Sequence, residues 1–271
     1  MMFWKQLIKA MKHMGFERNE VDPCLYWQWT DNGLVTWLSW VDDCMITGDK
    51  SEVEKYKNMM KGMFDCDDVG ELKEYVGCKL ERNWNKREIK VTQPVLLQSY
   101  KDEFELPKHS CTIPAEPSKV LMKAKANEGA CPEQQTKYRS GIGKLLHMMR
   151  WSRPEIWNPV RDGPRHMGNS NDDHSKSMTK IMKYCVDTPK RGWLLKPRRQ
   201  WDGKNKDFEF RLRAKSDSNF ATCVDTRRSI TGLVIWLEDA VIAVKSGMQR
   251  IVALSVMEAE VIAMVQAILV R

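Results

Sequence analysis

Two adjacent aspartates, Asp42 and Asp43, lie between two short apolar segments, Leu34–Val41 and Cys44–Thr47. The lengths and composition of these segments predict a β-hairpin that carries both carboxylates at its turn. A turn that serves stability alone favours Asn-Gly or Asp-Gly, whereas neighbouring carboxylates without a nearby Lys or Arg repel each other. Residues that break local rules in this way are expected at functional sites.

A pair of neighbouring carboxylates is suited to bind a divalent cation. Mg²⁺ prefers oxygen ligands and often binds through one or two carboxylates together with phosphate groups of the substrate. Two such ions, about 3.5–4 Å apart, stabilise the attacking and leaving oxygens in phosphoryl transfer. The simpler alternative is a solvent-exposed acidic turn, because Asp is common in turns. Asp42 and Asp43 are therefore candidate catalytic and metal-binding residues, with the acidic turn as the alternative.

The hydrophobic periodicity of the whole chain indicates an α+β fold. Apolar residues three or four positions apart predict helices, whereas alternation and short apolar runs predict strands. We expect Ser51 to cap the second helix and Asp172 or Asp173 to cap the fifth. Residues 106–136 are predicted as a linker or long loop, and 189–206 as a basic, turn-rich linker. The expected helices span 3–14, 51–64, 94–104, 138–149, 172–185 and 256–269, and further strands span 72–80, 88–92, 207–214, 233–237, 241–245 and 250–254.

The positive charge of the chain is concentrated in its second half. The net charge is +8, and residues 150–271 contain 22 basic and 14 acidic residues. Such a local surplus attracts polyanions through counterion release and electrostatic steering. Candidate nucleic-acid-binding residues in the basic linker are Lys190, Arg191, Arg198 and Arg199. The alternative is a solvated basic surface without a partner.

The cysteines and the apolar segments limit the class of protein further. None of the eight cysteines forms a C-x-x-C pair, which is typical of reduced thiols in an intracellular protein and argues against a zinc site. No apolar run reaches the roughly 18 residues that a membrane span needs, so no membrane partner is expected. The first residues also have no apolar core of the signal-peptide kind.

Several motifs in succession resemble the reverse transcriptases of copia-type LTR retrotransposons. Trp40-Val41-Asp42-Asp43 resembles their X-Val-Asp-Asp signature, and Asp22-Pro23-Cys24-Leu25-Tyr26 resembles the block before it. Asp68–Gly77 and Thr92-Gln93 resemble the blocks after it, and Tyr138-Arg139-Ser140 begins a further one. Each motif is moderately specific, but their order along nearly the whole chain is highly specific.

A second set of motifs resembles the RNase H region of the same family. Lys215-Ser216-Asp217-Ser218, then Asp225–Ser229, then the stretch up to Glu260 occur in the family's order. The resemblance implies that Asp217 and Glu258 are catalytic, metal-binding carboxylates, and we rank Glu260 second because it should point away from Glu258 on a helix. The alternative is an acid at a strand end and a glutamate favoured by the helix dipole.

The resemblance implies a domain order, a cofactor and partners. It assigns 1–105 to the C-terminal part of the palm and the start of the thumb, 106–206 to the thumb and connection, and 207–271 to a truncated RNase H-like domain. The cofactor would be Mg²⁺ or Mn²⁺. The partners would be an RNA template, an RNA–DNA duplex that Trp40 contacts by stacking, and the remainder of the Pol polyprotein. The location would be intracellular, in a cytoplasmic virus-like particle or the nucleus.

The sequence also departs from the family pattern. The family's third polymerase aspartate lies upstream of the segment at which this chain starts, and its next RNase H aspartate lies beyond Arg271. Asn219 replaces a second aspartate, and Pro159 and Pro164 interrupt an expected helix. We therefore expect neither polymerase nor RNase H turnover from this chain alone. Alternatives to an enzyme fragment are a non-catalytic nucleic-acid-binding remnant and a translation product without a function.

Overall fold

The computed structural model describes residues 2–116, 121–125 and 128–269. The chain forms two compact units, and neither unit is continuous in sequence. The first unit contains Met1–Leu72 and Arg199–Glu209, and the second contains Lys73–Arg198 and Phe210–Arg271. Every strand pair among these residues is antiparallel and helices pack on the sheets, so the structure is a mixed helix and sheet fold, compatible with the predicted α+β class.

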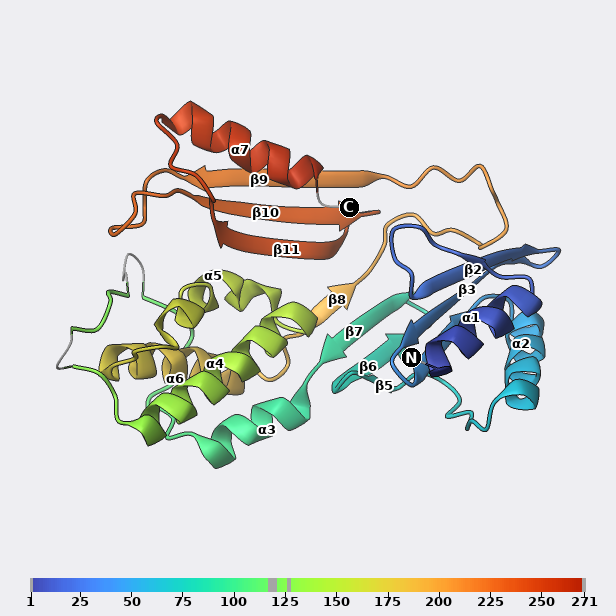
Figure 1. Cartoon of the computed structure of the whole chain (residues 1–271), viewed down its shortest axis with the longest axis horizontal. Coiled ribbons are helices and arrows are strands. Elements are labelled where there is room, and N and C mark those ends of the chain that lie inside the picture. The colour runs from blue at the N-terminus through green and yellow to red at the C-terminus, as the bar shows by residue number, and fades with distance from the viewer. Residues whose placement is uncertain (1, 117–120, 126–127, 270–271) are drawn as a thin grey trace. The chain divides into compact units, whose positions relative to one another are not determined.

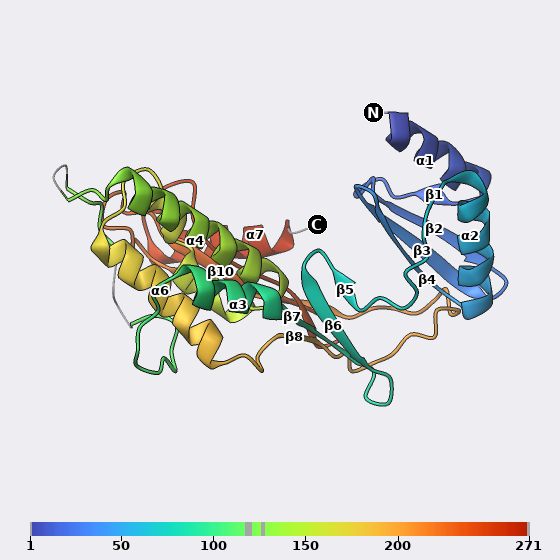
Figure 2. The same cartoon turned by 90° about the horizontal axis from the view of Figure 1, so that it is seen from below.

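The first unit is a four-stranded sheet with two helices packed against it (Figures 1 and 2). The strand order is β1-β2-β3-β4. The core between sheet and helices contains Leu7, Met11, Val35, Trp37 and Tyr56. The elements are α1 (Met2–His13), β1 (Glu17–Arg18), β2 (Leu25–Thr30), β3 (Gly33–Trp40), β4 (Asp43–Thr47) and α2 (Lys50–Met63).

The 199–209 segment also belongs to the first unit, where it packs on the turn between β2 and β3. The N–H of Leu34 donates to the carbonyl oxygen of Gly203 at 2.8 Å. The rings of Trp29 and Trp201 meet edge to face with centroids 6.0 Å apart. A chain segment that comes after residues 73–198 of the second unit therefore completes the packing of the first unit.

The second unit contains two antiparallel sheets and a helical core. Its first sheet has the order β5-β6-β7-β8, and its second has the order β11-β10-β9 with α7 on one face (Figure 1). The elements are β5 (Glu74–Tyr75), β6 (Cys78–Asn83), β7 (Glu88–Thr92), α3 (Pro94–Glu103), α4 (Pro132–Trp151), η1 (Pro154–Ile156), α5 (Trp157–Val160), η2 (Gly163–His166), α6 (Asp172–Asp187), β8 (Trp193–Leu195), β9 (Leu212–Asn219), β10 (Ile230–Leu237), β11 (Ala240–Met248) and α7 (Val256–Ile268).

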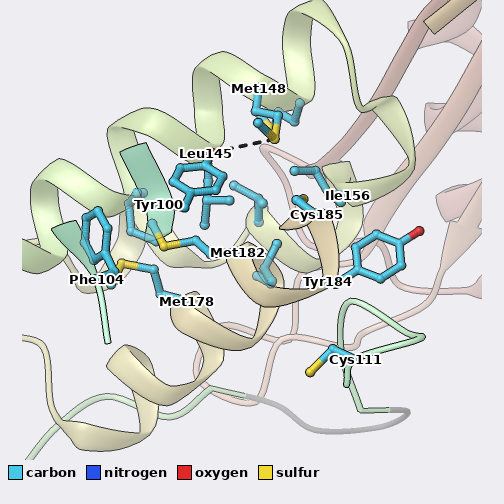
Figure 3. Close-up of a cluster of buried hydrophobic side chains, with 14 of the residues drawn as sticks. Tyr100, Phe104, Cys111, Leu145, Met148, Ile156, Met178, Met182, Tyr184 and Cys185 are labelled. Carbon is cyan, nitrogen blue, oxygen red and sulfur yellow. Dashed lines mark hydrogen bonds between the residues drawn. The ribbon is translucent and has the colours of Figure 1, made fainter. Parts of the chain in front are cut away.

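The helical core of the second unit is formed by α3, α4 and α6 (Figure 3). Tyr100, Leu145, Ile156 and Met182 are fully buried in it, together with several flexible methionines that fill irregular space. The Tyr100 hydroxyl donates to Met148 Sδ at 3.7 Å, a contact drawn as a dashed line in Figure 3. None of the helices that the structure describes is long and apolar enough to span a membrane.

Some local predictions were wrong. Asp49, not Ser51, caps α2, because its side chain accepts the N–H of Ser51 at 3.0 Å. Asn171, not Asp172 or Asp173, caps α6. Residues 250–254 form no strand, and the basic linker contains β8, which the sequence patterns did not reveal.

Candidate active site

The carboxylate turn, residues 40–43, closes the hairpin of β3 and β4. Trp40 pairs with Asp43, so Val41 and Asp42 are the two loop residues. Val41 has φ 54°, a left-handed conformation that a β-branched residue rarely adopts, and its side chain is 75% exposed. Backbone strain of this kind costs about 1–3 kcal/mol and concentrates at functional sites. The turn is therefore held in a conformation that its own sequence disfavours.

Both carboxylates of the turn are exposed. Asp42 lies in the loop and Asp43 begins β4, so two oxygen-rich side chains are adjacent at one end of the sheet. This donor set suits a hard divalent cation such as Mg²⁺ or Mn²⁺, which would draw its other ligands from water and substrate phosphates. Within the described ranges, no three His, Cys, Asp or Glu side chains gather in a group that could bind a metal ion. The turn thus offers two carboxylates that could hold such an ion.

Aromatic packing beneath the sheet holds this hairpin in place. The ring of Phe16 meets the rings of Tyr56 and of Trp37 in β3 edge to face, with centroids 4.8 Å and 6.2 Å apart. The Tyr56 hydroxyl donates to Gln28 Oε1 at 2.7 Å, which joins α2 to β2. The strand that ends at the carboxylate turn is therefore fixed by buried rings from several elements.

The second group of predicted carboxylates is divided between β9 and α7. Asp217 lies on β9 opposite Gly232 of β10. Ser255 caps α7, because its hydroxyl accepts the N–H of Glu258 at 3.2 Å, and Glu258 Oε2 accepts the N–H of Leu254 at 2.7 Å. Glu260 instead contacts β9, where its Oε1 accepts the N–H and hydroxyl of Ser218 at 3.2 and 2.8 Å. The helix carboxylate next to the strand of Asp217 is therefore Glu260, the residue ranked second from the sequence.

Asp217 also lines a cleft of 830 Å³ within the second unit. Opposite charges face each other there: Arg161 binds Asp162 at 2.6 Å, and Arg165 lies 3.6 Å from Asp225. Hydrogen bonds from Thr226, with a further one from Arg165, lower the pKa of the Cys223 thiol to about 7. The sequence did not single out this thiol, because only the fold brings Arg165 to within 3.5 Å of its sulfur.

Comparisons with known proteins show that the first part of the chain is similar to a known family. Residues 1–117 match the family described as reverse transcriptase (RNA-dependent DNA polymerase). Over 263 residues, or 93% of the chain, it is 27% identical to the retrovirus-related Pol polyprotein from transposon TNT 1-94 of Nicotiana tabacum. The chain is a relative of retrotransposon Pol polyproteins.

Two Pol polyproteins of Arabidopsis thaliana match the same chain. The one from transposon RE1 is 25% identical over 95% of the chain, and the one from transposon RE2 is 24% identical over 91%. This Pol-related chain spans 16–19% of the length of the three plant relatives. No solved structure matches it significantly.

The four candidate basic residues of this Pol-related chain do not form one cluster within a unit. Lys190, Arg191 and Arg198 belong to the second unit, whereas Arg199 belongs to the first. Arg191 Nη1 donates to the Tyr184 hydroxyl at 2.8 Å, and Arg199 Nη2 donates to the carbonyl oxygen of Glu209 at 2.5 Å. Arg191 and Arg199 are thus partly engaged inside their own units, while Lys190 is exposed.

Proposed function

We propose that this chain is a piece of a copia-type Pol polyprotein that carries the carboxylate hairpin of reverse transcriptase, followed by an RNase H-like segment. The strained, exposed turn with Asp42 and Asp43 carries this proposal. Its position within residues 1–117, which match the reverse transcriptase family, supports it further. In the full polyprotein, the substrates would be an RNA template and an RNA–DNA duplex, inside the cell in a particle or the nucleus.

Asp42 and Asp43 would hold Mg²⁺ or Mn²⁺ for phosphoryl transfer. The bound ions would supply charge stabilisation for the attacking and leaving oxygens. The chain's own contribution is to hold two carboxylates side by side on a rigid hairpin and to leave them open to phosphate. Because no third acidic side chain joins them among the described residues, we expect weak metal binding and no primer extension by this chain alone.

Metal binding and primer extension test this proposal together. Mn²⁺ titration followed by electron paramagnetic resonance should show a weak site that the double change Asp42→Asn, Asp43→Asn removes. Asp31→Asn is the matched control, because Asp31 is an exposed acid in another turn of the same sheet. Unchanged Mn²⁺ binding in the double variant would contradict the metal assignment. Primer extension that depends on both aspartates would instead show a complete polymerase site.

For the RNase H-like segment, we propose that Asp217 is the metal-binding carboxylate of β9 and that neither helix glutamate joins it. Side chains of neighbouring strand residues point to opposite faces, so the bonds of Ser218 to Glu260 put Asp217 on the face of β9 away from that glutamate. Glu258 Oε2 instead accepts the N–H of Leu254, just before α7. Asp217→Asn should therefore weaken Mn²⁺ binding, whereas Glu258→Gln and Glu260→Gln should leave it intact. A loss of Mn²⁺ binding in either glutamate variant would restore that glutamate as a metal ligand.

The second candidate function is nucleic-acid binding without catalysis. The excess of basic over acidic residues in 150–271 favours it, because this excess does not depend on a complete metal site. Trp40 and the basic residues Lys190, Arg191, Arg198 and Arg199 would contact an RNA–DNA duplex. We expect affinity to fall with salt, and Lys190→Gln to weaken binding more than Arg199→Gln, since Arg199 is engaged by Glu209 and lies 5.0 Å from the Phe208 ring. If neither change affects the affinity, the basic linker is only a solvated surface and does not contact nucleic acid.

A further inference from the structure

Residues 82–87 form the basic tip of the β6–β7 hairpin. The sequence Arg82-Asn83-Trp84-Asn85-Lys86-Arg87 contains three basic residues and no acidic one, and all six residues are exposed. Trp84 is 66% exposed, and the Arg82 guanidinium lies over its ring, 4.3 Å from the centroid. The tip thus presents an aromatic ring among cationic side chains.

The backbone of the basic tip is ordered by its own hydrogen bonds. Asn83 Oδ1 accepts the N–H of Lys86 at 3.1 Å, and the N–H of Arg87 donates to the carbonyl oxygen of Trp84 at 3.3 Å. Arg87 adopts φ 48°, which closes the loop onto Glu88, the residue that pairs with Asn83. A loop that is already ordered loses less conformational entropy when it binds a partner.

The two acidic residues that flank the basic tip are paired with lysines outside it. Glu81 binds Lys79 at 3.0 Å, and Glu88 binds Lys196 at 3.2 Å. These carboxylates therefore form no ion pair with Arg82 or Lys86. The tip keeps positive charge beside the Trp84 ring, and this charge complements an anionic partner.

An exposed tryptophan alone is common on protein surfaces and has no specific meaning. Its combination with a stacked guanidinium and a further exposed lysine is the usual chemistry of single-strand recognition, in which bases stack on aromatic rings and cations contact phosphates. We propose that the basic tip binds single-stranded nucleic acid, with an unpaired base on Trp84 and phosphates on Arg82 and Lys86. A duplex fits less well, because its bases already stack on one another.

This inference rests on the proposed function for the source of the nucleic acid, and it adds a contact outside the carboxylate hairpin. The test uses the full chain and fluorescence anisotropy with labelled single-stranded DNA, single-stranded RNA of the same sequence, and a blunt duplex. Trp84→Ala should weaken binding of one or both single strands about tenfold, as expected for one base–ring stack, and leave duplex binding unchanged. Trp84→Phe should keep most of the affinity, since phenylalanine also offers a ring face.

The salt dependence of single-strand binding tests the phosphate contacts. Arg82→Gln and Lys86→Gln should each reduce the slope of log affinity against log salt by about 0.7, because each variant would neutralise one phosphate fewer. Lys50→Gln, an exposed lysine of the first unit, is the matched control and should leave the slope unchanged.

The outcomes separate this inference from the proposed function. Single-strand binding that is equal in the parent and in Trp84→Ala would overturn the role of the tip and leave the Pol assignment intact. Trp84→Ala could instead weaken single-strand and duplex binding equally, or polyglutamate could displace the labelled strand as effectively as an oligonucleotide does. Either result would overturn the inference, because the tip would then bind any polyanion. A parent chain that binds no oligonucleotide would overturn both proposals.

Discussion

The imidazole rings of His166 and His174 lie stacked in the second unit, with centroids 3.9 Å apart and planes inclined by 18°. His174 Nδ1 accepts the N–H of Asn171, so its Nε2 carries the proton and donates to the Met122 carbonyl oxygen at 2.8 Å. His166 Nε2 is buried and has no hydrogen-bond partner among the described residues. Burial, with the neighbouring His174 as a second cause, lowers the pKa of His166 to about 4.

This stacked pair predicts loss of stability in mild acid. The unfolded chain protonates His166 near pH 6.5, whereas the folded chain does so only near pH 4. The contribution of neutral His166 to the free energy of unfolding is therefore complete above pH 6.5. About 3 kcal/mol of it is lost as the pH falls towards 4. In urea unfolding across this range, the free energy of unfolding should depend less on pH in His166→Phe than in the parent. His13→Phe, on the exposed surface of α1, should keep the parent's dependence, and equal slopes in all three chains would contradict the prediction.

Arg153 should be among the most sensitive positions of the second unit. Its side chain is 2% exposed and binds Glu155 at 2.6 Å, the Cys185 carbonyl oxygen at 3.3 Å and the Thr188 hydroxyl at 2.7 Å. Arg153→Met leaves these acceptors without their donor, so we expect a loss of about 3 kcal/mol in the free energy of unfolding. Arg150→Met, at an exposed position of α4, should cost less than about 0.5 kcal/mol in the same denaturant titration.

Gly33 should not tolerate a side chain. Its φ is 119°, and a Cβ there would lie 2.5 Å from the Gly203 carbonyl oxygen. Gly33→Ala should therefore lower the free energy of unfolding by about 2 kcal/mol and speed hydrogen exchange at the Leu34 amide, which donates to Gly203. Gly62→Ala, inside α2 with open space around it, should instead stabilise by up to about 1 kcal/mol. Unchanged exchange at Leu34 in Gly33→Ala would show that the 199–209 segment does not depend on this contact.

Val41→Gly should relieve strain in the carboxylate turn. Glycine adopts φ 54° without a steric penalty, although it also gains about 0.5–1 kcal/mol of entropy in the unfolded chain. Val69→Gly is the matched control, because Val69 is 90% exposed and is not among the residues with positive φ. We expect Val41→Gly to be more stable than Val69→Gly by about 1 kcal/mol in thermal unfolding. Equal values would mean that the turn stores no strain.

The sequence predicted those features that depend on local chemistry. The hairpin around Asp42 and Asp43, the proline that begins α3 at Pro94 and the helix of 256–268 follow from periodicity and backbone preferences, and all three are present. The helix caps were misplaced by one or two residues, because Asp49, Ser51, Asn171 and Asp172 are all good caps and only the backbone selects between them.

Features that depend on distant contacts were not predictable. β8 has three residues and is a strand only because Val91 and its neighbours in β7 pair with it from about a hundred positions earlier. The preference of Glu260 over Glu258 for β9 likewise depends on where Ser218 lies. The expected strand at 250–254 failed because its apolar residues, such as Ile251 and Leu254, remain exposed and unpaired by any neighbouring strand that the structure describes.

The position of the 199–209 segment sets the order in which the chain can fold. On the ribosome, residues 2–72 emerge before Trp201 and Gly203, so the contacts of the β2–β3 turn with the 199–209 segment form only after the whole of 73–198 has been synthesised. Contacts between segments so far apart in sequence are slow to form. A shortened fragment that ends near residue 117 would therefore present the carboxylate hairpin on an unfinished scaffold, however well its sequence matches the family.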